Sequence, residues 1–147
     1  MKKIKFVDLS DRQQSLVNAA SAAMQHAYAP YSKYPVGASV LTDKGNIYVG
    51  CNVERVTYSQ TTHAERNAVD TMIANGERRI DTLCCASLDG AIPCAECRQG
   101  MWEFCGGDSN VTVIASDKEK NITITTIGEI YPYPFGPEEL NINPKDF

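Results

Sequence analysis

Hydrophobic and polar positions follow one another along the chain at spacings that predict interleaved helices and strands. The first helical pattern opens at Ser10, which forms a capping box with Gln13. Apolar residues then recur every three or four positions up to Ala27, and Pro30 closes the segment. This stripe indicates a core-facing helix without chemistry of its own. Its members are Leu16, Val17, Ala20, Ala23, Met24 and Ala27.

Short apolar or β-branched runs predict five strands. A polar loop at 42–46 separates the first two runs and is typical of a hairpin. The runs cover residues 36–41, 47–52, 80–88, 111–115 and 122–126.

Two further helices are predicted between these strands. One covers about 62–75 and ends at Gly76, a residue favoured just beyond a helix. The other follows Pro93 and covers about 94–105. The aromatic, proline-rich segment 130–137 predicts an ordered turn with little regular structure. Strands interleaved with helices favour one mixed sheet covered on both faces.

Composition and charge narrow the class of protein. The chain has 147 residues, 43% of them hydrophobic, which predicts one globular domain over 1–147. The formal net charge is −4, and no basic stripe is present, so a small substrate is favoured over a nucleic-acid polymer. Lys2, Lys3 and Lys5 are interpreted as a frayed, solvated end.

No segment is apolar for long enough to span a membrane or has the pattern of a signal peptide. We therefore expect a cytoplasmic protein without a membrane partner. Thiols stay reduced in that compartment, so the six cysteines are not interpreted as a disulfide framework. Cys84, Cys85 and Cys105 are expected to be packing residues.

Two short motifs carry the candidate chemistry. His63 opens one predicted helix, and Cys94 and Cys97 open the next, where a spacing of three places both sulfurs on one face. One imidazole and two thiolates suit Zn²⁺ and leave the fourth tetrahedral position for water, as hydrolysis requires. The positive end of each helix dipole further favours the thiolate form. Glu65, two residues after His63, can be aimed at that position to move protons.

Simpler interpretations of the same residues remain open. Glu65 could complete a capping box with Thr62. A Cys-x-x-Cys pair could be a redox pair or half of a structural zinc site with a fourth protein ligand. The combination of His-x-Glu and Pro-Cys-x-x-Cys at successive helix starts, about thirty residues apart, is the known signature of zinc deaminases.

With these motifs in view, the chain resembles the cytidine deaminase family from about Ala27 to Gly136. The resemblance implies a three-layer α/β/α sandwich with a five-stranded mixed sheet, and small members are typically homotetramers. The segments that carry it are Ala29-Pro-Tyr-Ser-Lys-Tyr-Pro-Val-Gly-Ala38, Gly50-Cys-Asn-Val-Glu54, His63-Ala-Glu65, Pro93-Cys94…Cys97-Arg-Gln99 and Pro134-Phe-Gly-Pro137.

The resemblance also implies roles for individual residues. Asn52 and Glu54 would bind the ribose hydroxyls, and residues two apart on an extended segment do face the same way. The alternative is an ordinary polar strand end. Ala64 would contact the base edge through its backbone. Tyr34 and Phe135 would pack on the pyrimidine, and Tyr58 and Phe135 match positions that reach a neighbouring chain.

Several positions depart from the family pattern. Compact members of the family usually have cysteine where this chain has His63 and asparagine where it has Arg55, and phenylalanine is common where it has Tyr34. In members with a third cysteine, the arginine at the position of Arg66 offsets the charge of the extra thiolate. In this chain, Arg66 could instead fix the geometry of Cys94 or Cys97, or only contact solvent. The zinc loop usually has glycine after the first cysteine, whereas this chain has alanine and then Glu96. These changes bear on the substrate more than on the reaction.

The leading hypothesis is zinc-dependent hydrolysis of cytidine or deoxycytidine to the uridine product and ammonia, in pyrimidine salvage. Arg55 and Glu96 motivate a first alternative, deamination of a modified cytosine nucleoside such as a nucleoside antibiotic or an N4-substituted cytidine. A deaminase of free bases or of adenosine in RNA would share the zinc motifs without needing Asn52 and Glu54. A non-enzymatic zinc-stabilised binding module is the alternative from another class.

Overall fold

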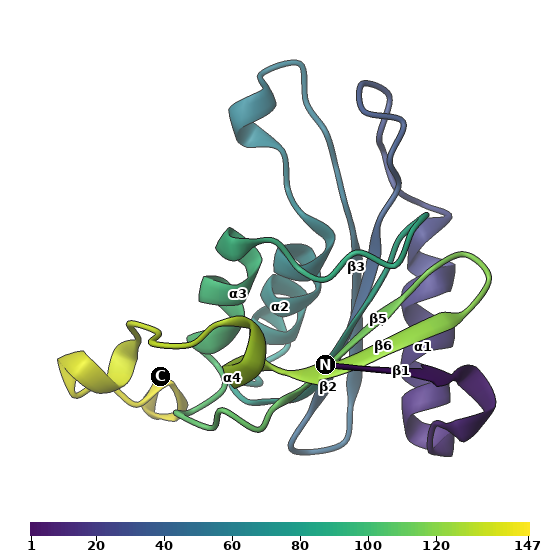
Figure 1. Cartoon of the computed structure of the whole chain (residues 1–147). Helices are drawn as coiled ribbons and strands as arrows, with labels where there is room; N and C mark the ends of the chain where they lie inside the picture. The colour runs from purple at the N-terminus through teal and green to yellow at the C-terminus, as the bar shows by residue number, and fades with distance from the viewer.

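Six strands form one mixed sheet in the computed structural model, which describes residues 1–147 (Figure 1). Their order is β1-β6-β5-β4-β2-β3. β4 and β5 run parallel, and every other neighbouring pair is antiparallel. The strands are β1 (Lys2–Lys5), β2 (Gly37–Thr42), β3 (Ile47–Cys51), β4 (Ile80–Ala86), β5 (Thr112–Ser116) and β6 (Asn121–Thr126).

Helices cover both faces of this sheet. α1 (Asp11–Met24) packs on one face, against β2, β3 and β4. α2 (Ala64–Ala74) packs on the opposite face with α3 (Ala95–Trp102) beside it, and α4 (Ile127–Ile130) lies next to α3 (Figure 1). The 3-10 helices are η1 (Phe6–Asp8), η2 (Tyr58–Gln60), η3 (Pro137–Leu140) and η4 (Pro144–Asp146). No helix combines the length and apolar character that crossing a membrane would require.

Two glycines allow the helices to approach the sheet closely. A Cβ atom on Gly37 would lie 2.0 Å from the carbonyl oxygen of Ala20, in α1. A Cβ atom on Gly50 would lie 2.4 Å from the backbone nitrogen of Ala68, in α2. Because no side chain fits at either contact, these positions fix how α1 and α2 sit on β2 and β3.

Each face of the sheet has its own apolar core. The core beneath α1 includes Leu16 and Val17 from the helix and Ile114 from β5. The core beneath α2 and α3 includes Met72, Leu83 and other residues of the central strands and both helices. The three-layer arrangement predicted from the alternating strands and helices is therefore confirmed.

The strand count requires a correction, because β1 adds a sixth strand to the five that we predicted. Lys2–Lys5, interpreted above as a frayed end, pairs with β6 in antiparallel register, with Ile4 opposite Ile122. Ile4 is the only apolar residue of this strand and packs on the α1-side core. One apolar residue is too weak a pattern to predict a strand, and flanking lysines are typical of a sheet edge.

The helix boundaries also differ from the prediction. Ser10 and Gln13 do form the capping box of α1. The helix ends at Met24, because Gln25, His26 and Ala27 each donate a backbone hydrogen bond three residues back, in a tighter turn. Within the segment 130–137, α4 ends at Ile130 and η3 begins at Pro137, which agrees with the prediction of little regular structure.

Glu129 provides a testable link between the fold and pH. The Thr125 hydroxyl donates to its carboxylate, and the Met1 ammonium lies 3.0 Å away. These contacts lower the pKa of Glu129 to about 2. A lowered pKa contributes stability that is present above the unfolded value and lost as pH falls through the folded one. Between about pH 4.5 and pH 2, we expect the free energy of unfolding to fall less steeply for Glu129→Gln than for the unmodified chain.

Urea denaturation of the untagged chain across this pH range measures the effect. Glu119→Gln is the control, because Glu119 is exposed and its carboxylate accepts no hydrogen bond. If the free energy of unfolding depended on pH in the same way for Glu129→Gln and the unmodified chain, the lowered pKa of Glu129 would not contribute to stability.

Candidate metal centre and active site

Three side chains converge where two helices begin. His63 is the N-cap residue of α2, Cys94 is the N-cap residue of α3, and Cys97 lies in the first turn of α3. The Nδ1 atom of His63 is 3.3 Å from the sulfur of Cys94 and 3.3 Å from that of Cys97. The three donor atoms all lie within 4.8 Å of one another. The structure thus brings together the residues predicted to hold the metal.

The start of α3 is fixed by its neighbours. Pro93 is fully buried, and its carbonyl oxygen accepts a hydrogen bond of 2.7 Å from Nε of Arg98. The same guanidinium donates to the carbonyl oxygen of Ile130, at 2.9 Å. Arg98 therefore holds the turn that presents Cys94 and Cys97, while the helix dipole favours negative charge there.

Glu65 is not used as a helix cap. Thr62 exchanges two backbone hydrogen bonds with Val53, so α2 begins only after His63, and no side chain caps it. The capping-box alternative is therefore wrong, and the Glu65 carboxylate is available for another role. Glu65 is 7% exposed, and one carboxylate oxygen lies 3.5 Å from the sulfur of Cys97.

The chemistry of this cluster fits a divalent cation. Burial raises the pKa of the Cys97 thiol, and the neighbouring Glu65 carboxylate raises it further. A cation among the three donors offsets both effects, because it stabilises the thiolate form. The cluster holds two sulfurs and one imidazole without a fourth histidine, cysteine or carboxylate donor. Such a donor set fits zinc with one coordination position left open.

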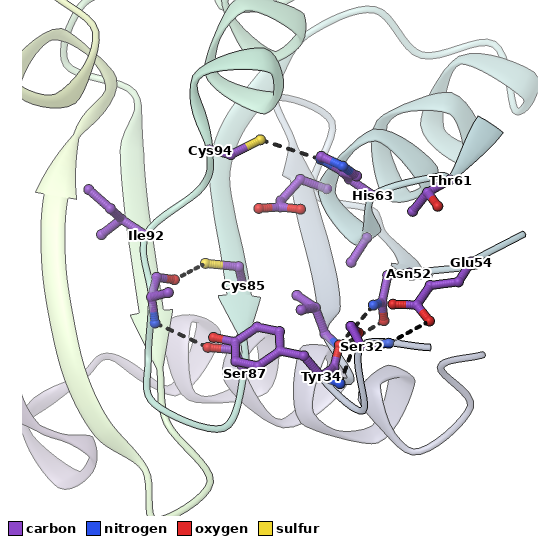
Figure 2. Close-up of a pocket in the computed structure, with 14 residues that line it drawn as sticks. Ser32, Tyr34, Asn52, Glu54, Thr61, His63, Cys85, Ser87, Ile92 and Cys94 are labelled. Atoms are coloured by element: carbon purple, nitrogen blue, oxygen red, sulfur yellow. Dashed lines mark hydrogen bonds between the residues drawn. The ribbon is translucent and has the colours of Figure 1, made fainter. Parts of the chain in front are cut away.

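A cavity of about 460 Å³ opens beside two of the three donors, His63 and Cys94 (Figure 2). His63, Cys94 and Glu65 line one end of it, together with Ala64. The size suits a small molecule such as a nucleoside. No lysine or arginine lines the cavity, whereas the carboxylates of Glu54 and Glu65 both do.

Asn52 and Glu54 also line this cavity and are both 8% exposed. One Glu54 carboxylate oxygen accepts backbone hydrogen bonds from Tyr31 and Ser32, at 2.8 and 3.2 Å. The Ser32 side chain and these N–H groups lower the pKa of Glu54, so the carboxylate is ionised at neutral pH. Its other oxygen remains available to accept from a ligand hydroxyl.

The remaining predicted substrate residues divide into two groups. Tyr34 and Ala64 line the cavity. Tyr58 and Phe135 do not, and they are 72% and 59% exposed. Tyr58 instead contacts the ring of Tyr31 edge-to-face, with centroids 5.6 Å apart. Within one chain, the structure therefore does not bring Tyr58 or Phe135 to the site, and their roles across a chain boundary stay a prediction.

Several cavity residues were missed by the sequence analysis. Cys85 was expected to be a packing residue, and it is buried, yet it also lines the cavity and donates to the carbonyl oxygen of Ala91. Ser87 and Ile92 line the same wall. Ser87 directly follows β4, and polar residues just beyond a buried strand often face a ligand crevice, so this position could have been found. The other missed lining residues are Ser32, Val36, Thr61 and Ala91.

The three charged residues that depart from the family pattern lie outside the cavity. Arg66 is exposed to solvent and forms an ion pair with Glu96 across α2 and α3, without a hydrogen bond to either cysteine. Arg55 donates to the carbonyl oxygens of Val53 and Gln60 within its own loop. Neither arginine forms a hydrogen bond or an ion pair with a residue that lines the cavity.

Comparison with known proteins agrees with this geometry. Residues 10–115 match the family of the cytidine and deoxycytidylate deaminase zinc-binding region. The cytidine deaminase of Sporosarcina psychrophila is 38% identical over 130 residues, which cover 87% of this chain and 94% of that protein. The cytidine deaminase of Halalkalibacterium halodurans is 32% identical over 131 residues, which cover 88% and 98%.

Solved structures show the same likeness. The crystal structure of cytidine deaminase from Burkholderia pseudomallei superposes with a TM-score of 0.78 at 32% identity, covering 86% of this chain and all of that one. The cytidine deaminase from Mycobacterium tuberculosis gives a TM-score of 0.72 at 32% identity, covering 87% and 99%.

Proposed function

Since the chain belongs to the family of cytidine and deoxycytidylate deaminases with this zinc-binding region, we propose that it hydrolyses cytidine or deoxycytidine to the uridine product and ammonia. One observation carries the proposal. His63, Cys94 and Cys97 converge at the end of a nucleoside-sized cavity, with a buried glutamate beside them.

The chemistry follows from what surrounds that end of the cavity. His63, Cys94 and Cys97 would hold a zinc ion, which would supply Lewis acidity and a water nucleophile at neutral pH. Glu65 takes a proton from the attacking water, delivers it to N3 of the cytosine ring, and then moves the proton of the new C4 hydroxyl group to the amino group, so that ammonia leaves and a C4 carbonyl remains. Its burial excludes competing solvent, and one carboxylate can serve all three transfers because the groups meet at one place.

The rest of the cavity orients the nucleoside. The ionised carboxylate of Glu54 accepts from a ribose hydroxyl through its free oxygen, with Asn52 beside it. Tyr34 provides an aromatic surface for the pyrimidine ring. The backbone of Ala64 lies next to Glu65 and contacts the base edge. These contacts hold C4 of the base toward His63 and Cys94.

Two carboxylates and no lysine or arginine line the cavity, which predicts a preference for the uncharged nucleoside over its phosphate. Placing like charges together costs several kcal/mol. We expect kcat/KM for deoxycytidine to exceed that for deoxycytidylate by about a hundredfold. Ammonia release from cytidine, deoxycytidine, deoxycytidylate and free cytosine, with zinc content measured on the same sample, tests the assignment. Preferential deamination of deoxycytidylate would contradict it.

The alternatives gain little support from the structure. Arg55 and Glu96 motivated a modified nucleoside as substrate, but neither side chain lines the cavity. A structural zinc module needs a fourth protein donor, and the cluster has three. An N4-substituted cytidine added to the substrate panel separates the first alternative, since a higher kcat/KM for it than for cytidine would favour that reaction.

We further propose that residues 1–147 act as one domain in a cytoplasmic homo-oligomer, with a tetramer favoured, that serves pyrimidine salvage. Exposed Tyr58 and Phe135 support the oligomer, because a neighbouring chain could bring such residues to the cavity mouth. Sedimentation of the purified chain tests the assembly, and a monomer with full activity would contradict it.

A further inference from the structure

Tyr34 is held in the cavity wall from two directions. Its backbone carbonyl accepts a hydrogen bond of 2.9 Å from the Asn52 amide. The same amide accepts from the backbone N–H of Val36, at 2.8 Å. At the far end of the side chain, the phenol hydroxyl donates to the carboxylate of Asp89. The segment around Tyr34 is thus fixed at one end to Asn52, just after β3, and at the other end to the loop that contains Asp89.

Asp89 belongs to a loop, residues 87–92, that is itself tied to the sheet. Its carboxylate also accepts from the Ser87 hydroxyl, at 3.2 Å, and that hydroxyl accepts from the backbone N–H of Ala91, at 3.0 Å. The backbone N–H of Ser87 donates to Ser116 in β5, and Asp89 forms a β-bridge with Asp117. The 87–92 loop therefore offers Tyr34 a rigid anchor.

This anchor closes one side of the cavity. Ser87, Ala91 and Ile92 line the wall, while Asp89 itself does not reach the cavity. Figure 2 shows Tyr34 pointing toward Ser87, at the end of the cavity away from Cys94. The contact joins segments 55 residues apart in the sequence. The Tyr34 segment and the 87–92 loop, which both contribute residues to the cavity lining, are thus joined by the Tyr34–Asp89 hydrogen bond.

The protonation states of Tyr34 and Asp89 favour a strong hydrogen bond between the two side chains. Hydrogen bonds from Tyr34 and Ser87 lower the pKa of Asp89, so it is ionised at neutral pH. Burial and the neighbouring Asp89 raise the pKa of Tyr34, so the phenol keeps its proton. A neutral donor and a charged acceptor make a stronger bond than two neutral groups.

We propose that Asp89 is a positioning residue for the substrate: by holding the Tyr34 phenol against the 87–92 loop, it fixes the aromatic wall on which the pyrimidine packs. This inference rests on the proposed function, because it assigns Asp89 to the binding step of that reaction. Asp89 acts on the substrate through the Tyr34 phenol, and its hydrogen bond with Ser87 keeps the 87–92 loop in place for that role. Its removal therefore weakens binding of the nucleoside, whereas proton transfer at Glu65 is left intact.

Steady-state kinetics with cytidine test the proposal. We expect Asp89→Ala to raise KM about tenfold, the equivalent of ~1.4 kcal/mol, with kcat within about twofold of the unmodified enzyme. Tyr34→Phe removes the same hydrogen bond and is expected to raise KM similarly. The double variant is expected to be no worse than Asp89→Ala, because Asp89→Ala already breaks the one contact that Tyr34→Phe removes. Asp89→Asn keeps an acceptor oxygen and is expected to restore most of the affinity.

Asp81→Ala is the control, since Asp81 is an exposed aspartate at the opposite end of β4. Calorimetry measures the affinity of each variant for uridine and so compares the variants without turnover. The melting temperature of each variant reports any loss of stability. An unchanged KM for Asp89→Ala, or additive effects with Tyr34→Phe, would overturn the proposal while leaving the deaminase activity established. An unmodified enzyme that neither releases ammonia nor binds uridine would overturn the proposed function and this inference together.

Discussion

Replacing Glu65 with glutamine is expected to reduce ammonia release from cytidine at least about a thousandfold while leaving the fold and the zinc content unchanged. General acid–base groups contribute about 10²–10⁴ in rate, and here one carboxylate serves three proton transfers. Glutamine has nearly the same shape and fills the same buried site, but it cannot carry a proton. Glu65 is 7% exposed, so bulk water does not readily substitute for it.

Turnover, zinc content and melting temperature of Glu65→Gln, measured on one preparation, check this prediction. Glu103→Gln is the control, because Glu103 lies at the end of α3 and outside the cavity. The control is expected to retain full activity. If Glu65→Gln retained near-normal kcat, the assignment of proton transfer to Glu65 would be wrong.

Loss of one thiolate ligand is expected to have the second large effect. Cys97 is 5% exposed, and its sulfur lies 3.3 Å from Nδ1 of His63. We expect Cys97→Ser to bind zinc at well below one equivalent and to lose at least about a thousandfold in activity, because a serine hydroxyl is a poor zinc ligand. Treating the unmodified enzyme with a chelator is expected to remove activity to the same extent, and added zinc to restore it.

Cys51→Ser provides the matched control for the thiolate. Cys51 is a free, half-buried cysteine on β3 that is not part of the three-donor cluster. We expect it to keep one zinc per chain. Stoichiometric zinc in Cys97→Ser, or full activity after complete chelation, would show that the metal is held elsewhere or is not required.

The sequence allowed most of the fold to be predicted because the apolar patterns are long and regular. The strands at 36–41 and 122–126 correspond closely to β2 (Gly37–Thr42) and β6 (Asn121–Thr126). β1 was missed, because Ile4 alone carries its pattern and its pairing with β6 depends on a segment more than a hundred residues away. Long-range pairing of this kind leaves little local signal.

The metal cluster could be predicted from residue types and spacing. His63 and Cys94 each occupy the N-cap position of a helix, and that position is encoded locally by the flanking residues. The opposite cavity wall could not be predicted in the same way. Asp89 acquires its role from a tertiary contact with Tyr34, so neither its residue type nor its spacing marks it in the sequence, whereas only the place of Ser87 just after β4 gives a signal.

X-ray absorption at the zinc edge of the purified protein tests the central claim most directly, because it counts sulfur and lighter ligands separately. The convergence of His63, Cys94 and Cys97 predicts two sulfurs at about 2.3 Å, with the imidazole nitrogen and one oxygen at about 2.0–2.1 Å. It also predicts that the oxygen contribution changes when a nucleoside fills the cavity. Three or four sulfur ligands, or a first coordination sphere that uridine leaves unchanged, would contradict the account.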